Sequence, residues 1–280
     1  MRYPIKESTV AIPGGETRYI AFGGGSKPLV LIQGLSTRGI QGMALPLAWM
    51  YRTFAKAYRV YCFDRRNEIP KEITVRELAD DVAAAMDAMG ISDADVLGVS
   101  QGGMIAQELA IQRPDLVHKL VLAVTLCQNN EKVVATVNHW VELAEPNKTR
   151  QLVGEILTKM YSERYQKRYR PFLPLLAFLQ QPKDPQRFIS LAKACLTCHT
   201  YERLSQIQCP VLVIGGRKDR VLGGEASMEL AQKLGCELFL YDDLGHAVYE
   251  EASDFNRRVF DFFQKPPAPA PARETSAPEP

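Results

Sequence analysis

Short, mostly apolar runs recur along the chain, at 29–32, 59–63, 95–98, 120–124 and 210–214. Continuous apolar runs of this length are typical of strands that are buried on both faces of a parallel sheet. A run at 237–241 predicts one more strand. Near the N-terminus, 9–12 and 17–22 flank a Pro-Gly-Gly-Glu turn and predict a β-hairpin.

Between these runs the apolar residues take the three- and four-residue spacing of helices, at 45–58, 74–89, 104–112, 225–234 and 254–263. Thr74 and Glu77 form a capping-box signature at the start of the second helix, and Gly90 ends it. Strand and helix alternate through most of the chain. This alternation predicts an α/β fold, with a mostly parallel, twisted sheet flanked by helices and built from right-handed crossovers.

The alternation stops between 129 and 205, where the clearest patterns are helical and lie at 131–145, 148–161 and 185–198. A segment this long is not a loop, so we expect a helical cap that packs on the carboxyl-terminal edge of the sheet. The predicted organisation is a core of 1–128 and 206–264, a cap of 129–205 and a tail of 265–280. The Pro/Ala-rich tail has almost no large apolar residues and is expected to be disordered.

Composition places the 280-residue chain among globular proteins, with 46% hydrophobic and 24% charged residues. A net charge of +2 gives no reason to expect nucleic acid or a membrane surface as a partner. No apolar run approaches the roughly 18 residues that cross a bilayer, and residues 1–7 lack the apolar core of a signal peptide. We therefore expect a cytoplasmic protein.

One stretch joins a strand end to a helix start. Gly98-Val99-Ser100-Gln101-Gly102 is a G-x-S-x-G between the strand pattern and the helical run that follows it. So sharp a turn strains the backbone of the middle residue and brings the chain close to itself two residues away on either side, where only glycine fits. The serine hydroxyl is held at a helix N-terminus, whose free N–H groups stabilise negative charge. The motif therefore predicts a serine nucleophile.

A serine hydroxyl needs a base within hydrogen-bond reach to act as a nucleophile near neutral pH. Of the four histidines, His246 is the best candidate, because it follows the last strand at the edge where ligands bind in open α/β folds. His118 precedes a strand on the far side, and His139 and His199 lie in the helical segment. Asp219, which follows the strand ending at 214 on the same edge, is predicted to orient the imidazole.

Two backbone N–H groups are predicted to bind the oxyanion that forms during attack. They belong to Gln101, directly after the serine, and to Leu35, after the first buried strand. Losing one such donor typically costs about 2.7–4 kcal/mol of transition-state stabilisation. The rigidity of this backbone therefore matters more than the two side chains.

Three further aspartates lie near strand ends and are expected to be structural. Asp242 and Asp243 are too close to His246 along the chain to orient it, and we expect them to be solvated. Asp64 is expected to form an ion pair with the arginines beside it, at 65 and 66.

Six cysteines are present, and one pair lies in Cys195-Leu196-Thr197-Cys198-His199, the spacing of a c-type haem attachment motif. Haem attachment takes place in exported proteins, and this motif lies late in a long helical pattern. No second C-x-x-C or histidine pair completes four ligands for a metal. We therefore expect buried, structural cysteines, no metal and no cofactor.

Residues 20–264 resemble the α/β-hydrolase superfamily, in the branch of small cap-bearing esterases, enol-lactonases and meta-cleavage-product hydrolases. The matching pieces are Gln33-Gly34-Leu35, Asp64-Arg65-Arg66, the stretch 98–103, the stretch 215–219 and Gly245-His246. The order serine, aspartate, histidine is the one that α/β-hydrolases use. A serine at 100 argues against the dehalogenases and epoxide hydrolases, which need a carboxylate nucleophile.

Two positions depart from the superfamily pattern. Gln33 stands where a histidine usually precedes the glycine of the oxyanion loop, and an amide side chain can still anchor that loop by hydrogen bonds. Asn67 stands where a glycine commonly follows the arginine, which affects a turn rather than the chemistry.

The motifs and the resemblance together predict a cofactor-independent serine hydrolase of a small carboxylic ester, lactone or thioester. Ser100, His246 and Asp219 would act through an acyl-enzyme. Two alternatives stay open: C–C bond hydrolysis of a β-diketone-like acid by the same residues, and a hydrolase fold that binds a small ligand without turnover. Basic residues outnumber acidic ones between 148 and 170, which favours a solvated helix surface over attraction of an anionic substrate.

Overall fold

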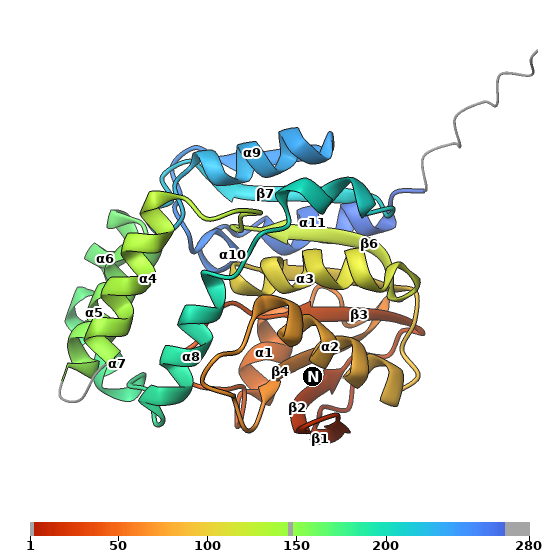
Figure 1. The fold of residues 1–280 in the computed structure, drawn as a ribbon, viewed down its shortest axis with the longest axis horizontal. Coiled ribbons are helices and arrows are strands. Elements are labelled where there is room, and N and C mark those ends of the chain that lie inside the picture. Colours follow the sequence, from red (N-terminus) through yellow and green to blue (C-terminus); the bar gives the residue numbers. More distant parts are fainter. Residues whose placement is uncertain (1–2, 145–147, 267–280) are drawn as a thin grey trace, which may run out of the picture.

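The computed structural model describes residues 3–144 and 148–266, and its centre is an eight-stranded sheet in the order β1-β2-β4-β3-β5-β6-β7-β8 (Figure 1). The pairs β1–β2 and β2–β4 are antiparallel, and all other neighbours are parallel. The strands are β1 (Lys6–Ile12), β2 (Gly15–Phe22), β3 (Lys27–Ile32), β4 (Tyr58–Arg66), β5 (Ala94–Val99), β6 (Val117–Ala123), β7 (Val211–Gly216) and β8 (Glu237–Tyr241). The predicted α/β class with a mostly parallel sheet is confirmed.

Each central strand contributes to two cores, because successive side chains point to opposite faces of a sheet. One face is covered by α2 (Val75–Ala88), α3 (Gln101–Gln112) and α9 (Glu225–Leu234), and the other by α1 (Ala44–Met50) and α11 (Phe255–Gln264). On β3, Val30 and Ile32 pack into the first core, and Leu29 and Leu31 into the second. All four are at most 1% exposed, and burying each such side chain contributes roughly 1.5–3 kcal/mol.

The predicted capping box at the start of α2 is confirmed. The backbone N–H of Glu77 donates to Thr74 Oγ1 over 3.1 Å, and the Glu77 carboxylate accepts from the Thr74 N–H over 2.8 Å. Two of the backbone donors that a helix start leaves free are thereby satisfied. Gly90 follows with a φ of 64°, a left-handed conformation that suits glycine at a helix end.

The first helix is shorter than predicted. It ends at Met50, and turns continue the chain to Ala57. In these turns the carbonyls of Ala55 and Tyr58 accept from the N–H groups of Gly24 and Gly25. The end of this segment is therefore bound to the preceding glycine turn.

Among the described residues, five α-helices lie between β6 and β7, beside the carboxyl ends of the parallel strands, at the left of Figure 1. They are α4 (Glu131–Ala144), α5 (Thr149–Met160), α6 (Glu163–Tyr169), α7 (Leu173–Leu179) and α8 (Pro185–Cys195). The first, second and last follow the three patterns found in the sequence. The two short helices, α6 and α7, carry too few residues for a helical period to be recognised.

The C-terminal part of the described chain is α11, after which Lys265 pairs with Glu237 on β8 over 2.6 Å. The predicted disordered tail of 265–280 lies, from residue 267 on, outside the described residues. Across 3–144 and 148–266, none of the helices combines the length and the hydropathy needed to cross a bilayer.

Candidate active site

Ser100 lies in the sharp connection between β5 and α3, with φ 53° and ψ −121°. A positive φ is costly for a serine and is typical of a nucleophile held in a strand-to-helix turn. The close approach predicted for the two glycines is present, since a Cβ at Gly98 would lie 2.8 Å from Ala106 Cβ and one at Gly102 would collide with the Ile32 carbonyl oxygen. A hydrogen bond from the Ser100 N–H to the Ala123 carbonyl, over 2.9 Å, fixes the turn to β6.

Asp219 and His246 are brought together by two loops that pack against each other at the same sheet edge. Asp219 follows β7, and His246 follows β8. The N–H of Lys218 donates to the Leu244 carbonyl over 3.0 Å, which ties the first loop to the second. A Cβ at Gly216 would lie 2.7 Å from that same carbonyl oxygen, so the loops can approach this closely only because the residue is glycine.

The three predicted site residues form one continuous chain of hydrogen bonds. His246 Nε2 lies 2.9 Å from Ser100 Oγ, and His246 Nδ1 lies 2.7 Å from Asp219 Oδ2. The other carboxylate oxygen, Oδ1, accepts from the N–H groups of Val221 and Leu222 over 2.7 and 2.9 Å. His246 and Asp219 are 3% and 5% exposed, so their hydrogen bonds are shielded from water.

This geometry fits one arrangement of protons. Asp219 Oδ1 accepts from two backbone N–H groups and Oδ2 faces His246 Nδ1, so an ionised carboxylate can accept a hydrogen bond from His246 Nδ1–H. The neutral imidazole then has a free lone pair on Nε2, directed at the Ser100 hydroxyl. The arrangement can accept the serine proton and stabilise the imidazolium that forms.

The two predicted oxyanion donors belong to segments next to Ser100. The Gln101 N–H is the first of α3, and Leu35 belongs to the loop after β3. Among the backbone hydrogen bonds of the described residues, neither of these N–H groups donates to another carbonyl. The loop is adjacent to the serine, since a Cβ at Gly34 would lie 3.8 Å from Ser100 Oγ.

A family model described as the alpha/beta hydrolase fold matches residues 27–253. The chain belongs to this family. It is 25% identical over 251 residues to RutD of Rhizobium rhizogenes, a proposed carbamate hydrolase, which covers 81% of this chain and 90% of the relative. It is also 25% identical over 217 residues to 3-oxoadipate enol-lactonase 1 of Acinetobacter baylyi, covering 74% and 79%. The crystal structure of the enol-lactonase of Burkholderia xenovorans superposes with a TM-score of 0.79 at 23% identity, over 92% of this chain and 100% of that one.

These relatives are hydrolases by name, and together with the family membership they support a hydrolytic enzyme. The names concern different bonds, those of a carbamate and of a lactone. The structural likeness at 23% identity shows the shared fold alone.

In this α/β-hydrolase the loop after β3 and the serine turn are joined by a buried arginine that the sequence did not indicate as a site residue. Arg65 Nη2 donates to the Gln33 carbonyl over 2.6 Å and to Gln101 Oε1 over 3.2 Å. The Gln101 side chain in turn donates to the Leu191 carbonyl of α8 over 2.6 Å. Gln33 Nε2 donates to Cys62 Sγ over 3.4 Å. The glutamine that replaces the usual histidine therefore does anchor the loop by a hydrogen bond, as expected.

The expected ion pair between Asp64 and its neighbouring arginines is wrong. Asp64 Oδ1 lies 3.7 Å from Arg187 of α8, and its carboxylate accepts from the N–H groups of Arg65 and Ile40. Arg66 pairs instead with Asp81 of α2. Asp64 and Arg65 lie near each other, but each is held by partners distant in sequence, Asp64 by Arg187 and Arg65 by Gln33 and Gln101.

The remaining histidines lie elsewhere in the hydrolase. His118 is 2.7 Å from Asp95, in a cluster with Lys27 at the amino-terminal end of the strands, and His139 is exposed on α4. His199 follows α8 and its backbone bridges to Gln128. Within the described residues no three His, Cys, Asp or Glu side chains group as metal ligands would.

The cysteines of the haem-like motif, Cys195 and Cys198, are both free and buried. Burial raises the pKa of the Cys195 thiol to about 11 and raises that of Cys198 as well. Thiols with raised pKa values are poor nucleophiles and poor metal ligands. Cys195 Sγ instead contacts Gln101 Nε2 at 3.2 Å, beneath the serine turn.

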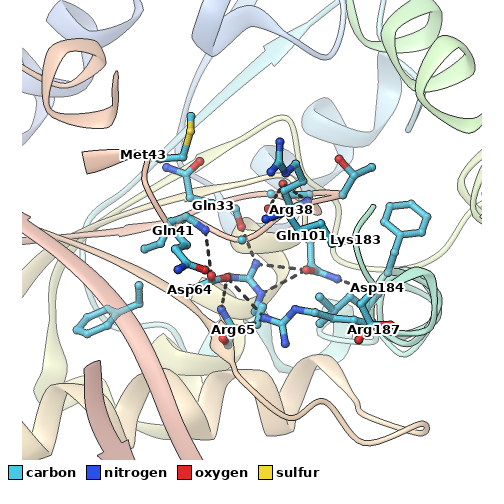
Figure 2. A pocket seen from close by; sticks show the side chains of 18 of the residues that line it. Gln33, Arg38, Gln41, Met43, Asp64, Arg65, Gln101, Lys183, Asp184 and Arg187 are labelled. Atoms are coloured by element: carbon cyan, nitrogen blue, oxygen red, sulfur yellow. Dashed lines mark hydrogen bonds and ion pairs between the residues drawn. The ribbon is translucent and has the colours of Figure 1, made fainter. Parts of the chain in front are cut away.

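Two cavities flank the site. One of about 470 Å³ lies between the loop after β3, the end of β4 and the start of α8, and includes Gly34 and Gln101 in its wall (Figure 2). The other, of about 1040 Å³, is a groove between α6 and the loops that carry Asp219 and Gly245. The smaller cavity is therefore the one whose wall includes Gln101, next to Ser100, and the loop after β3.

Proposed function

We propose that this α/β-hydrolase is a cofactor-independent serine hydrolase of a small carboxylic ester, lactone or thioester, with Ser100, His246 and Asp219 as its catalytic residues. The observation that carries the proposal is the unbroken hydrogen-bond chain from Asp219 through His246 to a serine held at positive φ. A general base within 2.9 Å of a hydroxyl is the arrangement that makes a serine nucleophilic near neutral pH.

In the proposed reaction Ser100 Oγ forms a bond to the carbonyl carbon while its proton moves to His246 Nε2. Asp219 holds the resulting imidazolium through Nδ1–H. The negative charge on the carbonyl oxygen is bound by the N–H groups of Leu35 and Gln101, each of which supplies about 2.7–4 kcal/mol. His246 then returns the proton to the departing oxygen or sulfur, and a water molecule activated by the same imidazole hydrolyses the acyl-enzyme.

We further propose that 129–205 acts as a cap on a core formed by 1–128 and 206–264. Two contacts support this division, because each links a helix of the segment to the catalytic turns. The Ala247 N–H, next to His246, donates to the Met160 carbonyl at the end of α5 over 3.0 Å. The Gln101 side chain, next to Ser100, donates to Leu191 of α8. Movement of these helices would therefore displace the loops that carry Ser100 and His246.

Turnover of a small panel tests the proposal. The panel contains an aryl ester, a lactone, a thioester and a vinylogous diketone, assayed with the native protein, Ser100→Ala and Ser253→Ala. Ser253 is an exposed serine outside the site and provides a matched control. We expect Ser100→Ala to lower kcat on the ester by about 10⁴–10⁶-fold, with Ser253→Ala unchanged.

Other outcomes separate the alternatives. Turnover of the diketone alone would replace the proposal with C–C bond hydrolysis. No turnover of any panel member by a folded native protein would favour ligand binding without catalysis.

A further inference from the structure

The cavity of about 470 Å³ beside the oxyanion loop is not used by the mechanism above. It shares part of its wall with the catalytic turn, because Gly34 and Gln101 line it and a Cβ at Gly34 would lie 3.8 Å from Ser100 Oγ. A group attached to a carbonyl at Ser100 therefore needs only a few bonds to reach this space.

The inner wall of this cavity carries Arg65, which is 6% exposed. Its Nη2 donates to Gln33 and Gln101, and its Nε lies 3.4 Å from the Gln101 amide oxygen. Nη1 has no acceptor among the described residues, and none of their carboxylate oxygens lies within 4 Å of any nitrogen of this guanidinium. Figure 2 shows the side chain between Asp64 and Gln101 in the cavity wall.

A buried cation of this kind is incompletely compensated. Burial lowers the pKa of the Arg65 guanidinium, and the nearby Asp64 carboxylate opposes that shift only in part. Buried charges in proteins are usually paired or bound to a ligand, since an unpaired one is costly. The free edge of Arg65 is therefore a place where an incoming anion gains binding energy.

Basic side chains outnumber acidic ones around the rest of the cavity. Besides Arg65 the wall holds Arg38, Lys183 and Arg187, against the two carboxylates of Asp64 and Asp184. Both carboxylates are already engaged, Asp64 by backbone N–H groups and by Arg187, and Asp184 as the cap that accepts from the first turn of α8. The lining therefore has a net positive charge.

We propose that this cavity is a subsite for a carboxylate carried by the substrate, bound through Arg65 Nη1 and drawn in by Lys183 and Arg38. The assignment rests on the proposed function, and it narrows the substrate to an ester, lactone or thioester whose acyl part ends in an anion. A singly charged carboxylate suits the one free edge of Arg65. A phosphate dianion would bring more negative charge beside Asp64 in the same wall.

A matched pair of esters tests the subsite. Para-nitrophenyl hydrogen glutarate and para-nitrophenyl valerate have acyl chains of equal length, and only the first ends in a carboxylate. We expect native protein to prefer the glutarate ester in kcat/KM, and Arg65→Met to lower that preference by about 10- to 100-fold, the effect of losing a hydrogen bond to a charged group. Arg59→Met is the control and should keep the preference. Arg59 lies at the opposite end of the same strand, where its side chain donates to the Gly23 carbonyl.

Arg65 also holds Gln33 and Gln101, so its replacement should slow both esters, and only the ratio reports the subsite. An equal loss on both esters would overturn the proposal and leave Arg65 as a positioning residue. Lys183→Glu provides a second variant, because it reverses a charge at the rim without touching the Gln33 and Gln101 bonds. We expect Lys183→Glu to lower the preference as well. If Arg65→Met does not fold, an unchanged preference in Lys183→Glu refutes the subsite.

A binding measurement separates failure of the subsite from failure of the proposed reaction. Glutarate is titrated calorimetrically into Ser100→Ala and into the double variant that also carries Arg65→Met. Binding to the first and at least tenfold weaker binding to the second supports the subsite even if no ester is turned over. Equal or absent binding in both overturns it even if neutral esters are hydrolysed.

Discussion

Replacing Asp219 with asparagine tests the proton positions on which the proposed mechanism depends. In the native structure Oδ1 accepts from the N–H groups of Val221 and Leu222, and Oδ2 accepts from His246 Nδ1. Asparagine has one acceptor and one donor group, so it can serve only one of these two sides. Turning its amino group toward Val221 and Leu222 would leave two buried donors without acceptors, at about 1–3 kcal/mol each.

The orientation that keeps the amide oxygen on the two backbone donors is therefore lower in free energy than the reversed one by about 2–6 kcal/mol. The amino group then donates to His246 Nδ1, which has to be the unprotonated nitrogen. Nε2 carries the proton instead and can no longer accept that of Ser100. The equivalent change in a Ser-His-Asp protease lowers kcat about 10⁴-fold, which corresponds to about 5 kcal/mol in the barrier. We expect Asp219→Asn to lose 10³- to 10⁴-fold in kcat on an aryl ester.

The assay is steady-state ester hydrolysis across pH 6 to 9, with thermal unfolding to verify the fold. Asp242→Asn is the matched control, because the Asp242 side chain is 76% exposed and, within the described part of the chain, pairs with Arg217 alone. Its kcat should stay within about twofold, since an exposed ion pair contributes little. If Asp219→Asn kept more than a tenth of the native kcat with an unaltered pH profile, the tautomer argument would be refuted.

Three further predictions concern the serine turn and the buried thiols. Gly102→Ala places a Cβ against the Ile32 carbonyl oxygen, so we expect a loss of about 1–3 kcal/mol in the free energy of unfolding; an unchanged urea midpoint would contradict the close packing. Ser100→Gly should be more stable than Ser100→Ala by about 1 kcal/mol in the same assay, because a φ of 53° suits glycine, and equal midpoints would argue against backbone strain. Burial raises the pKa values of Cys195 and Cys198, so neither should react with an aromatic disulfide at pH 8 before unfolding; rapid labelling of either residue in the native protein, located by peptide mass spectrometry because Cys209 and Cys236 are only partly buried, would be inconsistent with their burial.

The parts of the fold that follow from local sequence were predicted well. Buried parallel strands appear in the sequence as continuous apolar runs, and the capping box of α2 depends on two residues within a stretch of four. The first helix was predicted too long, because the segment after Met50 continues as turns with shorter-range bonds, such as that from the Phe54 N–H to the Tyr51 carbonyl, and the spacing of apolar residues does not distinguish such turns from a helix.

The site was predictable where topology alone brings residues together. Ser100, Asp219 and His246 each follow a parallel strand, and the carboxyl ends of parallel strands meet at one edge. Arg65 was missed because its neighbours are Gln33 and Gln101, which only the completed sheet places beside it. For the same reason the pairing of Asp64 with α8 was not foreseen.

The most direct test of the central claim is to find the residue that a fluorophosphonate labels. Such a probe reacts with a serine only when a base has activated the hydroxyl beside an oxyanion site. The proposed mechanism predicts one adduct per chain, mapped to Ser100 by peptide mass spectrometry and absent after His246→Ala. A folded native protein that gives no adduct, or an adduct at another serine, would contradict it.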